Sequence, residues 1–468
     1  MAVSIPMALK SWLCGFIAVT FLTACGGGSS SDLPGDVGNR TYASDASLAI
    51  TPLAAPPPTR ISSTWGRIAL FQVFDERAHH GMTTNQILQD APRYDAVWGA
   101  GRPSVWNSAH PSMLVSLYFI QEQDWRQAGG HNLTWWQANH PDWILYACDG
   151  TGTPTHRIAY MHGETDVPLD IHNPAVADYQ IRQTFGPYAS AHGYNALAID
   201  EVFFFDDMGW DLGPGYYGCG IWSNGGFIRR YSGRYDPQWA SDTLAWIKSA
   251  KSIVTTDPVI GPQHLALIVN HPPSAVSNPN EEQLLANVDA LLDESGFSMY
   301  GNFASDTHHF KATLDYMIYA QRHGVAMLMV DKFVQDSVTV TPLHLEYSIA
   351  TYLMGNEQGA ALFTTPNNGP GVGYGMEQYH PEYKSNLGTP CAQYYGGPGY
   401  DANNPDIYYR RFNGGLAVVN SGSKSKTSEL ATLPAGHTYT DIENRTVSNP
   451  LAVNSNDAYV LLTSNGCN

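Results

Sequence analysis

The chain has 468 residues, enough for one large domain and a small companion, and 43% of them are hydrophobic, which excludes a wholly disordered protein. Only 14% of the residues are charged, whereas 12% are aromatic. The formal net charge of −18 argues against a nucleic-acid partner, because phosphate binding needs basic patches. A chain poor in charge but rich in Tyr and Trp suits a neutral, polar ligand.

The first 24 residues predict a bacterial export signal. Lys10 supplies the positive charge, and the apolar run Trp12–Phe21 is too short to remain as a membrane span. The sequence Leu-Thr-Ala-Cys at residues 22–25 resembles the lipoprotein box, in which the cysteine is lipidated. We therefore expect Cys25 to carry a lipid anchor in the bacterial cell envelope, at the outer membrane or its periplasmic face. A plain signal peptide that releases a secreted protein is the alternative.

Residues 25–60 are rich in Gly, Ser, Asp, Ala and Pro and predict a flexible linker after the lipidated cysteine. Beyond this linker the chain contains four cysteines, Cys148, Cys219, Cys391 and Cys467. In an oxidising compartment they allow three disulfide pairings, and the sequence does not choose among them. None lies in a CxxC motif, which argues against a zinc ribbon or a redox motif.

From residue 61 to residue 405, apolar runs alternate with helical stretches. The runs expected to form strands are Ile68–Phe74, Tyr94–Trp98, Met113–Phe119, Ala196–Glu201, Leu265–Asn270, Ala290–Glu294, Val325–Val330 and Ala360–Thr364. Helices are expected at Gln238–Val254, Phe310–His323 and Leu343–Met354. Apolar strands separated by helices indicate a parallel sheet buried on both faces, and eight such units predict an α/β fold, the (β/α)8 TIM barrel. A doubly wound open sheet is the alternative, but no GxGxxG motif follows the first predicted strand to support it.

The pattern changes in residues 406–468, where helical periodicity is absent. Short strand-like runs at Leu416–Asn420, Thr438-Tyr439 and Ala458–Leu462 are separated by Ser, Asn, Gly and Pro. This pattern predicts a small C-terminal antiparallel β-sandwich that packs after the barrel.

Acidic doublets end two of the predicted barrel strands, Asp200-Glu201 at the fourth and Asp293-Glu294 at the sixth. Barrel active sites lie at the C-terminal ends of the strands. Successive side chains on a strand point to opposite sides, so at most one acid of each doublet can point into the mouth. Two carboxyl groups across the mouth suit glycosidic cleavage, in which one protonates the leaving oxygen and the other attacks carbon or activates water. A single doublet equally suits a helix cap or a solvated loop.

The stretch from Phe203 to Trp222, expected as a loop after the fourth strand, is rich in aromatic and acidic residues. Flat aromatic faces pack against the C–H faces of sugar rings, and carboxylates bind hydroxyl groups. We therefore expect sugar contacts from Trp210 and Trp222. Acids at or near other predicted strands are further substrate-binding candidates, namely Asp75, Asp170 and Asp331. Asp170 equally suits the fixing of a loop.

Other chemistries find no motif in the sequence. There is no HxH, no HExxH and no Cys/His cluster, so we expect no metal site and no cofactor. A GxSxG elbow and a Walker loop are also absent. The expected partner is a polysaccharide or oligosaccharide, and no obligate protein partner is evident.

Four stretches of the sequence resemble a known bacterial family. Residues 169–174 and 193–200 are similar to the D-x-x-N-P and G-Y/F-D-G-x-x-x-D motifs of the glycoside hydrolases called hypothetical glycosyl hydrolase family fifteen. Residues 288–294 resemble its V-D-G-x-x-x-E strand, and residues 409–420 resemble the R-x-F-x-N-G-x-V-L-V-N run that begins its C-terminal β domain. The resemblance spans roughly Arg67 to Leu462.

This resemblance implies a TIM-barrel glycosidase in which Asp200 and Glu294 occupy the positions expected to be catalytic. The chain departs from the family pattern at Asn195 and Ala196, which stand where the family has Asp-Gly. The departure removes a carboxylate just upstream of the fourth strand and puts substrate contacts there in doubt.

The sequence therefore predicts a glycosidase that cleaves a polysaccharide with two carboxyl groups. Asp200 is the expected nucleophile or base and Glu294 the expected general acid, with Glu201 and Asp293 as the alternatives within each doublet. Retention and inversion at the sugar both stay open. The competing hypotheses are a non-catalytic glycan-binding lipoprotein on the same barrel and a scaffold or adhesin that only displays loops.

Overall fold

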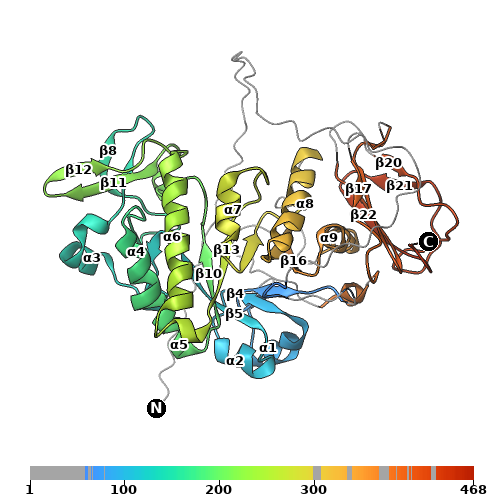
Figure 1. The fold of residues 1–468 in the computed structure, drawn as a ribbon, viewed down its shortest axis with the longest axis horizontal. Helices are drawn as coiled ribbons and strands as arrows, with labels where there is room; N and C mark the ends of the chain where they lie inside the picture. Colours follow the sequence, from blue (N-terminus) through green and yellow to red (C-terminus); the bar gives the residue numbers. More distant parts are fainter. Residues whose placement is uncertain are drawn as a thin grey trace.

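The computed structural model describes residues 58–467 except for 62–64, 66, 78–79, 299–306, 335–339, 368–378, 386, 398–399, 402 and 423–427. The expected signal peptide, Cys25 and nearly all of the expected linker lie outside the described residues. A barrel forms the middle of the molecule, an inserted sheet lies on one side of it, and a β domain lies on the other (Figure 1). Within the described ranges, no helix is both long and apolar enough to cross a membrane.

Eight parallel strands form the barrel wall. In spatial order they are β1 (Phe71–Val73), β4 (Ala96–Trp98), β5 (Leu114–Ile120), β10 (Ala196–Asp200), β13 (Ala266–Asn270), β14 (Ala290–Asp293), β15 (Ala326–Val334) and β16 (Ala360–Asn367). The first and last strands meet where the Leu362 N–H donates to the Ala69 carbonyl at 2.9 Å, next to a parallel bridge between Leu70 and Leu362. Each predicted strand overlaps one of the eight. The (β/α)8 barrel is therefore confirmed, and the open-sheet alternative is wrong because the sheet closes.

Helices surround this wall and separate its strands. They are α1 (Thr84–Asp90), α2 (Pro103–Ala109), α3 (Leu133–Asn139), α4 (Pro174–Asp178), a π-helical turn (Tyr179–Phe185), α5 (Gly186–His192), α6 (Pro237–Thr256), α7 (Pro279–Leu285), α8 (Thr307–Arg322) and α9 (Pro342–Gly355). The three predicted helices correspond to α6, α8 and α9. Several starts follow the usual chemistry: Asp236 accepts a hydrogen bond from the Gln238 N–H, and Pro237 is the first residue of α6.

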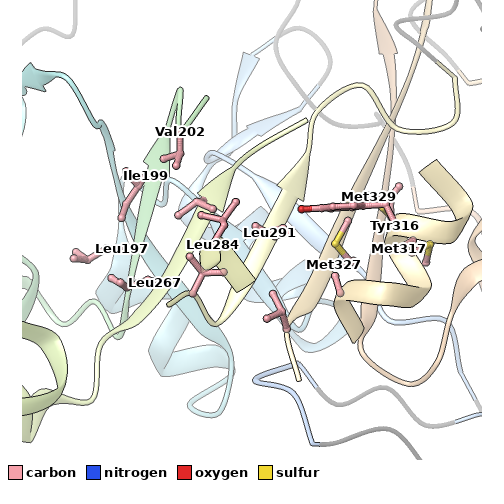
Figure 2. Close-up of a cluster of buried hydrophobic side chains, with 14 of the residues drawn as sticks. Leu197, Ile199, Val202, Leu267, Leu284, Leu291, Tyr316, Met317, Met327 and Met329 are labelled. Carbon is pink, nitrogen blue, oxygen red and sulfur yellow. The ribbon is translucent and has the colours of Figure 1, made fainter. Parts of the chain in front are cut away.

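Apolar side chains fill the layer between the strands and the helices. Figure 2 shows Leu197 and Ile199 of β10, Leu291 of β14, and Met327 of β15 in this layer, with Tyr316 of α8 nearby. All five are buried. Burying a side chain of this size contributes about 1.5–3 kcal/mol, so this layer holds the strand ends in place.

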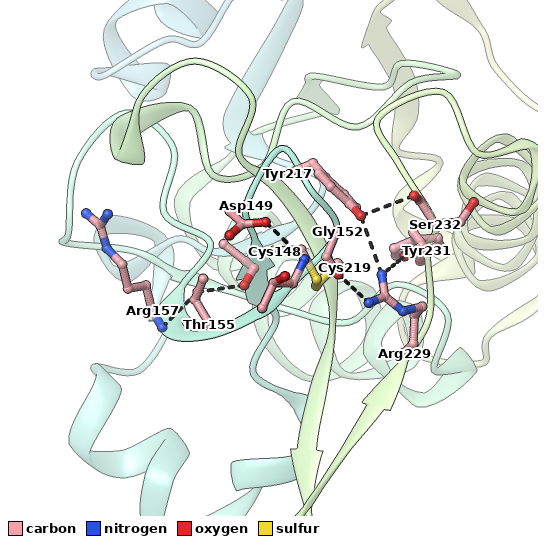
Figure 3. Close-up of a disulfide and its surroundings, with 12 residues drawn as sticks. Cys148, Asp149, Gly152, Thr155, Arg157, Tyr217, Cys219, Arg229, Tyr231 and Ser232 are labelled. Atoms are coloured by element: carbon pink, nitrogen blue, oxygen red, sulfur yellow. Dashed lines mark hydrogen bonds between the residues drawn. A yellow bond between two sulfur atoms is a disulfide. The ribbon is translucent and has the colours of Figure 1, made fainter.

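Two chain segments that flank β10 form an inserted antiparallel sheet. Its strands are β12 (Gly226–Arg229), β11 (Tyr217–Ser223), β7 (Tyr146–Cys148) and β8 (Pro154–Ile158), in that order. A disulfide joins Cys148 of β7 to Cys219 of β11, and Arg229 donates a hydrogen bond to the Gly152 carbonyl (Figure 3). The expected loop from Phe203 to Trp222 is therefore partly wrong, since its end belongs to β11. The sheet ties the connections before and after β10 to each other.

Two short antiparallel pairs lie elsewhere in the barrel's connections. They are β2 (Glu76–Arg77) with β3 (His80–Gly81), and β6 (Gln123–Asp124) with β9 (Val167–Pro168). Both follow the C-terminal end of a barrel strand, β1 and β5 respectively. They belong to the loops that surround the mouth of the barrel.

The C-terminal part is an antiparallel sandwich, as predicted. One sheet has the order β17 (Tyr395–Gly396), β18 (Ile407–Phe412), β19 (Gly415–Asn420) and β22 (Asp457–Leu462), and the other contains β20 (Ser428–Ala431) and β21 (Leu451–Asn454). A disulfide joins Cys391 to Cys467. Of the three predicted runs, Thr438-Tyr439 is not a strand; instead Thr440 forms isolated bridges.

Helix α9 connects this domain to the barrel, because it packs against both β16 and β22. The buried Arg410 of β18 donates hydrogen bonds to the carbonyls of Leu353, Met354 and Asn356 and pairs with Glu357. These carbonyls at the end of a helix have no partner within the helix. The arginine therefore satisfies them and fixes the two domains together.

Candidate active site

The interior of the barrel is filled by alternate residues of each strand. On four neighbouring strands these interior residues form one apolar cluster that contains Ala196, Ala198, Ala266, Ile268, Ala290, Leu292, Ala326, Leu328 and Val330. Because side chains alternate along a strand, the next inward positions at the C-terminal ends are Asp200, Asn270, Glu294 and Lys332. Polar side chains thus replace the apolar core at the barrel mouth.

These four side chains form a continuous chain of interactions across the mouth. The amide nitrogen of Asn270 donates to Asp200 Oδ1 at 2.7 Å and lies 3.2 Å from Glu294 Oε2. The two carboxylate oxygens are therefore at most about 6 Å apart, the sum of these two distances. On the far side, the ammonium of Lys332 forms an ion pair with Glu294 Oε1. The structure brings Asp200 and Glu294 together, which is the arrangement that the two doublets predicted.

The environments of the two carboxyl groups differ. Asp200 also accepts a hydrogen bond from the Tyr118 hydroxyl at 2.6 Å, so both of its oxygens are held by donors. Burial raises the pKa of Asp200, and the negative charge of Glu294 raises it further, while the bonds from Tyr118 and Asn270 oppose this rise. The side chain of Glu294 is 33% exposed and can reach solvent, whereas that of Lys332 is only 6% exposed.

Glu201 points away from this pair and meets a histidine from another loop. Its Oε1 lies 3.2 Å from Nε2 of His162, which follows β8. Burial raises the pKa of Glu201 to about 8, although the hydrogen bond from His162 lowers it. Burial lowers the pKa of His162, but the hydrogen bond to Glu201 and the charges of Glu201, Asp200 and Asp211 raise it to about 9.

Backbone strain gathers at the same place. His162 and Glu201 have φ values of 57° and 59°, and Phe74 at the end of β1 has 52°. A non-glycine residue in this left-handed region costs on the order of 1–3 kcal/mol and persists where the surrounding structure demands it. Phe74 packs edge-on against Tyr118, the residue that holds Asp200. The strained residues therefore surround the carboxyl pair.

The remaining acid of the second doublet, Asp293, lies on the opposite face of its strand. It is fully buried and caps the turn after β14 by accepting hydrogen bonds from the N–H groups of Ser295 at 3.0 Å and Gly296 at 3.1 Å. Burial raises its pKa to about 7. Asp331 of β15 is similar, because it is buried and accepts from the N–H groups of Phe297 and Ser298. Both carboxyl groups face the helix layer, not the mouth.

The other acids predicted to bind substrate are held by protein groups. The carboxylate of Asp75 accepts hydrogen bonds from Arg102 Nε at 3.0 Å and Trp106 Nε1 at 2.6 Å. Asp170 is fully buried and pairs with Arg230 at 2.9 Å. Burial raises the pKa of Asp170, whereas the charge of Arg230 lowers it. In this structure Asp170 fixes the connection between β9 and α4 to the end of β12.

The two tryptophans predicted to contact sugar lie on different elements. Trp210 is 63% exposed, and its neighbour Asp211 accepts a hydrogen bond from the Gly163 N–H, next to His162. Trp222 lies in β11, where its ring stacks on His156 with centroids 4.2 Å apart and its Nε1 donates to the Thr155 carbonyl. Of the two tryptophans, only Trp210 lies next to a residue that contacts the loop of His162.

Sequence reasoning missed Tyr118, Asn270 and His162. Asn270 ends the fifth predicted strand as Asp200-Glu201 ends the fourth, so a search for any polar strand end would have found it. Tyr118 lies inside the third predicted strand, where nothing in the sequence shows that its hydroxyl faces the mouth. His162 lies in a loop that only the inserted sheet brings to Glu201.

Metal binding receives no positive support from the arrangement of the side chains. Among the residues with described positions, no group of three or more His, Cys, Asp and Glu side chains is placed to hold a metal ion.

Comparison with known proteins finds distant structural likeness only. No protein-family model and no curated protein matches the chain. Solved structures with a similar fold include a cycloalternan-forming enzyme from Listeria monocytogenes in complex with a pentasaccharide substrate, with a TM-score of 0.42 and 12% identity over 87% of this chain and 42% of that one. A second is a cycloalternan-degrading enzyme from Trueperella pyogenes, with a TM-score of 0.41 and 9% identity over 87% of this chain and 63% of that one. A third is the gamma-CGTase from Alkalophilic bacillus clarkii, with a TM-score of 0.40 and 11% identity over 87% of this chain and 70% of that one.

The chain spans less than half of the length of the Listeria enzyme. At this level of similarity, no activity follows from the likeness.

Proposed function

We propose that the protein is a glycosidase that hydrolyses a polysaccharide through the carboxyl groups of Asp200 and Glu294. The observation that carries this proposal is the amide of Asn270, which lies within hydrogen-bond distance of both groups. It limits the separation of their nearest oxygens to about 6 Å, and retaining glycosidases hold their two carboxyl groups about 5–5.5 Å apart. Inverting enzymes need roughly 6.5–9.5 Å to admit a water molecule. The spacing therefore favours retention.

Asp200 is the nucleophile in this mechanism, because hydrogen bonds to both of its oxygens fix its orientation. It attacks the anomeric carbon while the glycosidic C–O bond breaks, and Glu294 gives its proton to the leaving oxygen. Water then attacks the sugar–Asp200 ester and returns a proton to Glu294, which restores both carboxyl groups. The exposure of Glu294 suits a group that must meet the leaving group and the water in turn.

The closeness of the two carboxyl groups and the neighbouring Lys332 support these two roles. Two carboxyl groups this close repel when both are ionised, so the pair tends to keep one proton. The first step requires this proton on Glu294, and the hydrogen bonds from Tyr118 and Asn270 favour the ionised form of Asp200. Lys332 faces the other oxygen of Glu294 and stabilises the carboxylate that remains after the proton has left. These roles for Asp200 and Glu294 agree with the assignment expected from the sequence.

The test is a screen for reducing ends released from soluble polysaccharides, with wild type and the Asp200→Asn variant side by side. The proposal expects release from at least one polysaccharide by wild type and none by the variant. Binding without release by wild type would favour the non-catalytic glycan-binding protein. Release at the wild-type rate by the variant would remove Asp200 from the mechanism.

We further propose that the protein works in the bacterial cell envelope, anchored through lipid on Cys25. Support comes from the sequence of residues 22–25 and from the two disulfides, Cys148–Cys219 and Cys391–Cys467, which are typical of oxidising compartments. Replacement of Cys25 by Ser is expected to abolish palmitate labelling and to move the protein out of the membrane fraction. Labelling that survives this change would contradict the anchor.

A further inference from the structure

An exposed aromatic side chain lies on a segment that is tied to the loop after β10 and that the mechanism does not use. Tyr235 is 77% exposed, the highest value for a large hydrophobic side chain in the described part of the protein, and it lies in the short link between β12 and α6. The Asp206 N–H donates to the Arg234 carbonyl at 2.8 Å, which ties this link to the loop after β10. That loop begins at Glu201.

Arg234 joins Tyr235 to a second ring. The guanidinium carbon of Arg234 lies 5.2 Å from the ring centroid of Phe205 and 5.8 Å from that of Tyr235, and the two rings are 6.0 Å apart. At these distances the negative face of each ring attracts the positive charge of the guanidinium, which is a cation–π interaction. Phe205, Arg234 and Tyr235 thus form one surface, which we call the aromatic platform.

The aromatic platform has little net charge, although it contains an arginine. Arg234 forms an ion pair with Asp207, and both side chains are partly exposed. An anionic ligand would meet the carboxylate of Asp207 as well as the guanidinium. A neutral ligand with hydroxyl groups can instead bond to either charged group at its edge while its apolar face covers a ring.

Phe203 connects the aromatic platform to the start of the loop that follows β10. Its ring stacks on Phe205 with centroids 5.1 Å apart, and both rings line the same small cavity as Glu201. Glu201 directly follows Asp200, the proposed nucleophile. The aromatic platform is therefore built on the loop that leaves the barrel directly after the proposed nucleophile, at the end of the barrel that carries the carboxyl pair.

We propose that the aromatic platform is a subsite for a neutral sugar unit of the substrate polysaccharide, beyond the bond that is cleaved. The sugar would lay the C–H face of its ring on Tyr235 and direct its hydroxyl groups to Arg234 and Asp207. The identification of the ligand as a polysaccharide rests on the proposed glycosidase function. The surface itself rests on the contacts of Phe205, Arg234 and Tyr235.

The experiment measures binding without turnover. The full chain carrying Asp200→Asn is run through native gels that contain dextran, pullulan, soluble xylan or polygalacturonate. We expect retardation by at least one of the three neutral polysaccharides and not by polygalacturonate alone. Adding Tyr235→Ala is expected to weaken the apparent affinity about tenfold, the loss of about one stacking contact.

Two further variants make the result specific. Tyr235→Phe keeps the ring and is expected to bind like its parent. Tyr400→Ala removes another exposed tyrosine, 49% exposed and placed in the C-terminal region, and is also expected to bind like its parent. The subsite would be overturned if Tyr235→Ala left the retardation unchanged, or if Tyr235→Ala and Tyr400→Ala weakened binding equally. It would also be overturned if only the polygalacturonate gel, or none of the gels, retarded the protein.

Failure of the subsite and failure of the proposed function give different results. Retardation that depends on Tyr235, with no reducing ends released from the same polysaccharide by wild type, keeps the subsite and rejects hydrolysis. Hydrolysis by wild type with binding unchanged by Tyr235→Ala keeps the enzyme and rejects the subsite.

Discussion

The ends of β10 and β14 carry the same kind of sequence, an acidic doublet after an apolar run, yet the two doublets are used in opposite order. At β10 the first acid, Asp200, points into the mouth, and the second, Glu201, turns away to His162. At β14 the first acid, Asp293, caps a buried turn, and the second, Glu294, enters the mouth. What decides is the phase of the strand: Ala198 and Leu292 face the barrel interior, and the acid two residues later follows them.

Position at a strand end therefore does not by itself determine which acid of a doublet points into the mouth. One acid of each doublet is available for chemistry. Of the other two acids, Glu201 contacts His162 in the loop after β8, and Asp293 caps the turn that follows β14. Mutations in the two doublets are therefore expected to separate activity from stability.

The largest expected effect is the loss of activity in Asp200→Asn and Glu294→Gln. In the proposed mechanism each variant lacks a group that forms or breaks a bond to the sugar or its leaving oxygen, so we expect kcat to fall on the order of 10⁴-fold. Initial rates on the polysaccharide identified by the reducing-sugar screen provide the measurement. Thermal unfolding followed by circular dichroism is the control for folding. A variant that keeps near-wild-type kcat would remove that residue from the pair.

A smaller effect is expected from Asn270→Ala, which removes the amide between the two doublets. The hydrogen bond from Asn270 lowers the pKa of Asp200, so its loss raises that pKa further. The acidic limb of the pH–rate profile is therefore expected to move to higher pH, and kcat to fall roughly 10–100-fold. Asn287→Ala, on the loop before β14, is a matched control. An unshifted acidic limb would show that Asn270 does not act on the nucleophile.

Glu201→Gln is expected to change the rate less than tenfold near pH 6, because Glu201 is protonated there and the amide resembles the neutral acid. Burial raises the pKa of Glu201 to about 8, so wild type gains a negative charge beside Asp200 above that pH. The profile of wild type is expected to contain a transition near pH 8 that the variant lacks. Loss of activity as deep as in Glu294→Gln would instead place Glu201 in the reaction.

The smallest effect on activity is expected from Asp293→Asn, whose kcat we expect to equal that of wild type. Its effect is on stability, because the pKa of Asp293 is raised to about 7 in the folded protein. The protonated form of this acid is more stable in the folded protein than the ionised form. The free energy of unfolding of wild type is therefore expected to fall by up to about 4 kcal/mol as the pH rises from about 4 towards 7.

Asparagine keeps the oxygen that accepts from Ser295 and Gly296 but does not ionise. Denaturant melts at pH 4.5 and pH 8 are therefore expected to show that the stability of Asp293→Asn relative to wild type rises with pH. The same difference at both pH values would contradict a buried, protonated Asp293.

The fold was largely predictable, because each barrel strand is an apolar run of the right length between helices. The same property prevented a prediction of which side chains point into the mouth. A strand that is apolar on both faces does not reveal which face points inward, so the choice between Asp200 and Glu201 stayed open. His162 could not be found because it reaches Glu201 through the inserted sheet, whose strands β7 and β11 come from different connections. The pairing of Cys148 with Cys219 depends on that same sheet.

In the proposed mechanism Asp200 and Glu294 act as a closely spaced, retaining pair. The measurement is the anomeric configuration of the first product. It is read by proton NMR within minutes of adding wild-type protein to the polysaccharide that the reducing-sugar screen identifies, before mutarotation. We expect the new reducing end to have the configuration of the bond that was cleaved. A first product with the opposite configuration would contradict the claim, because inversion requires room for a water molecule that the contacts of Asn270 do not leave.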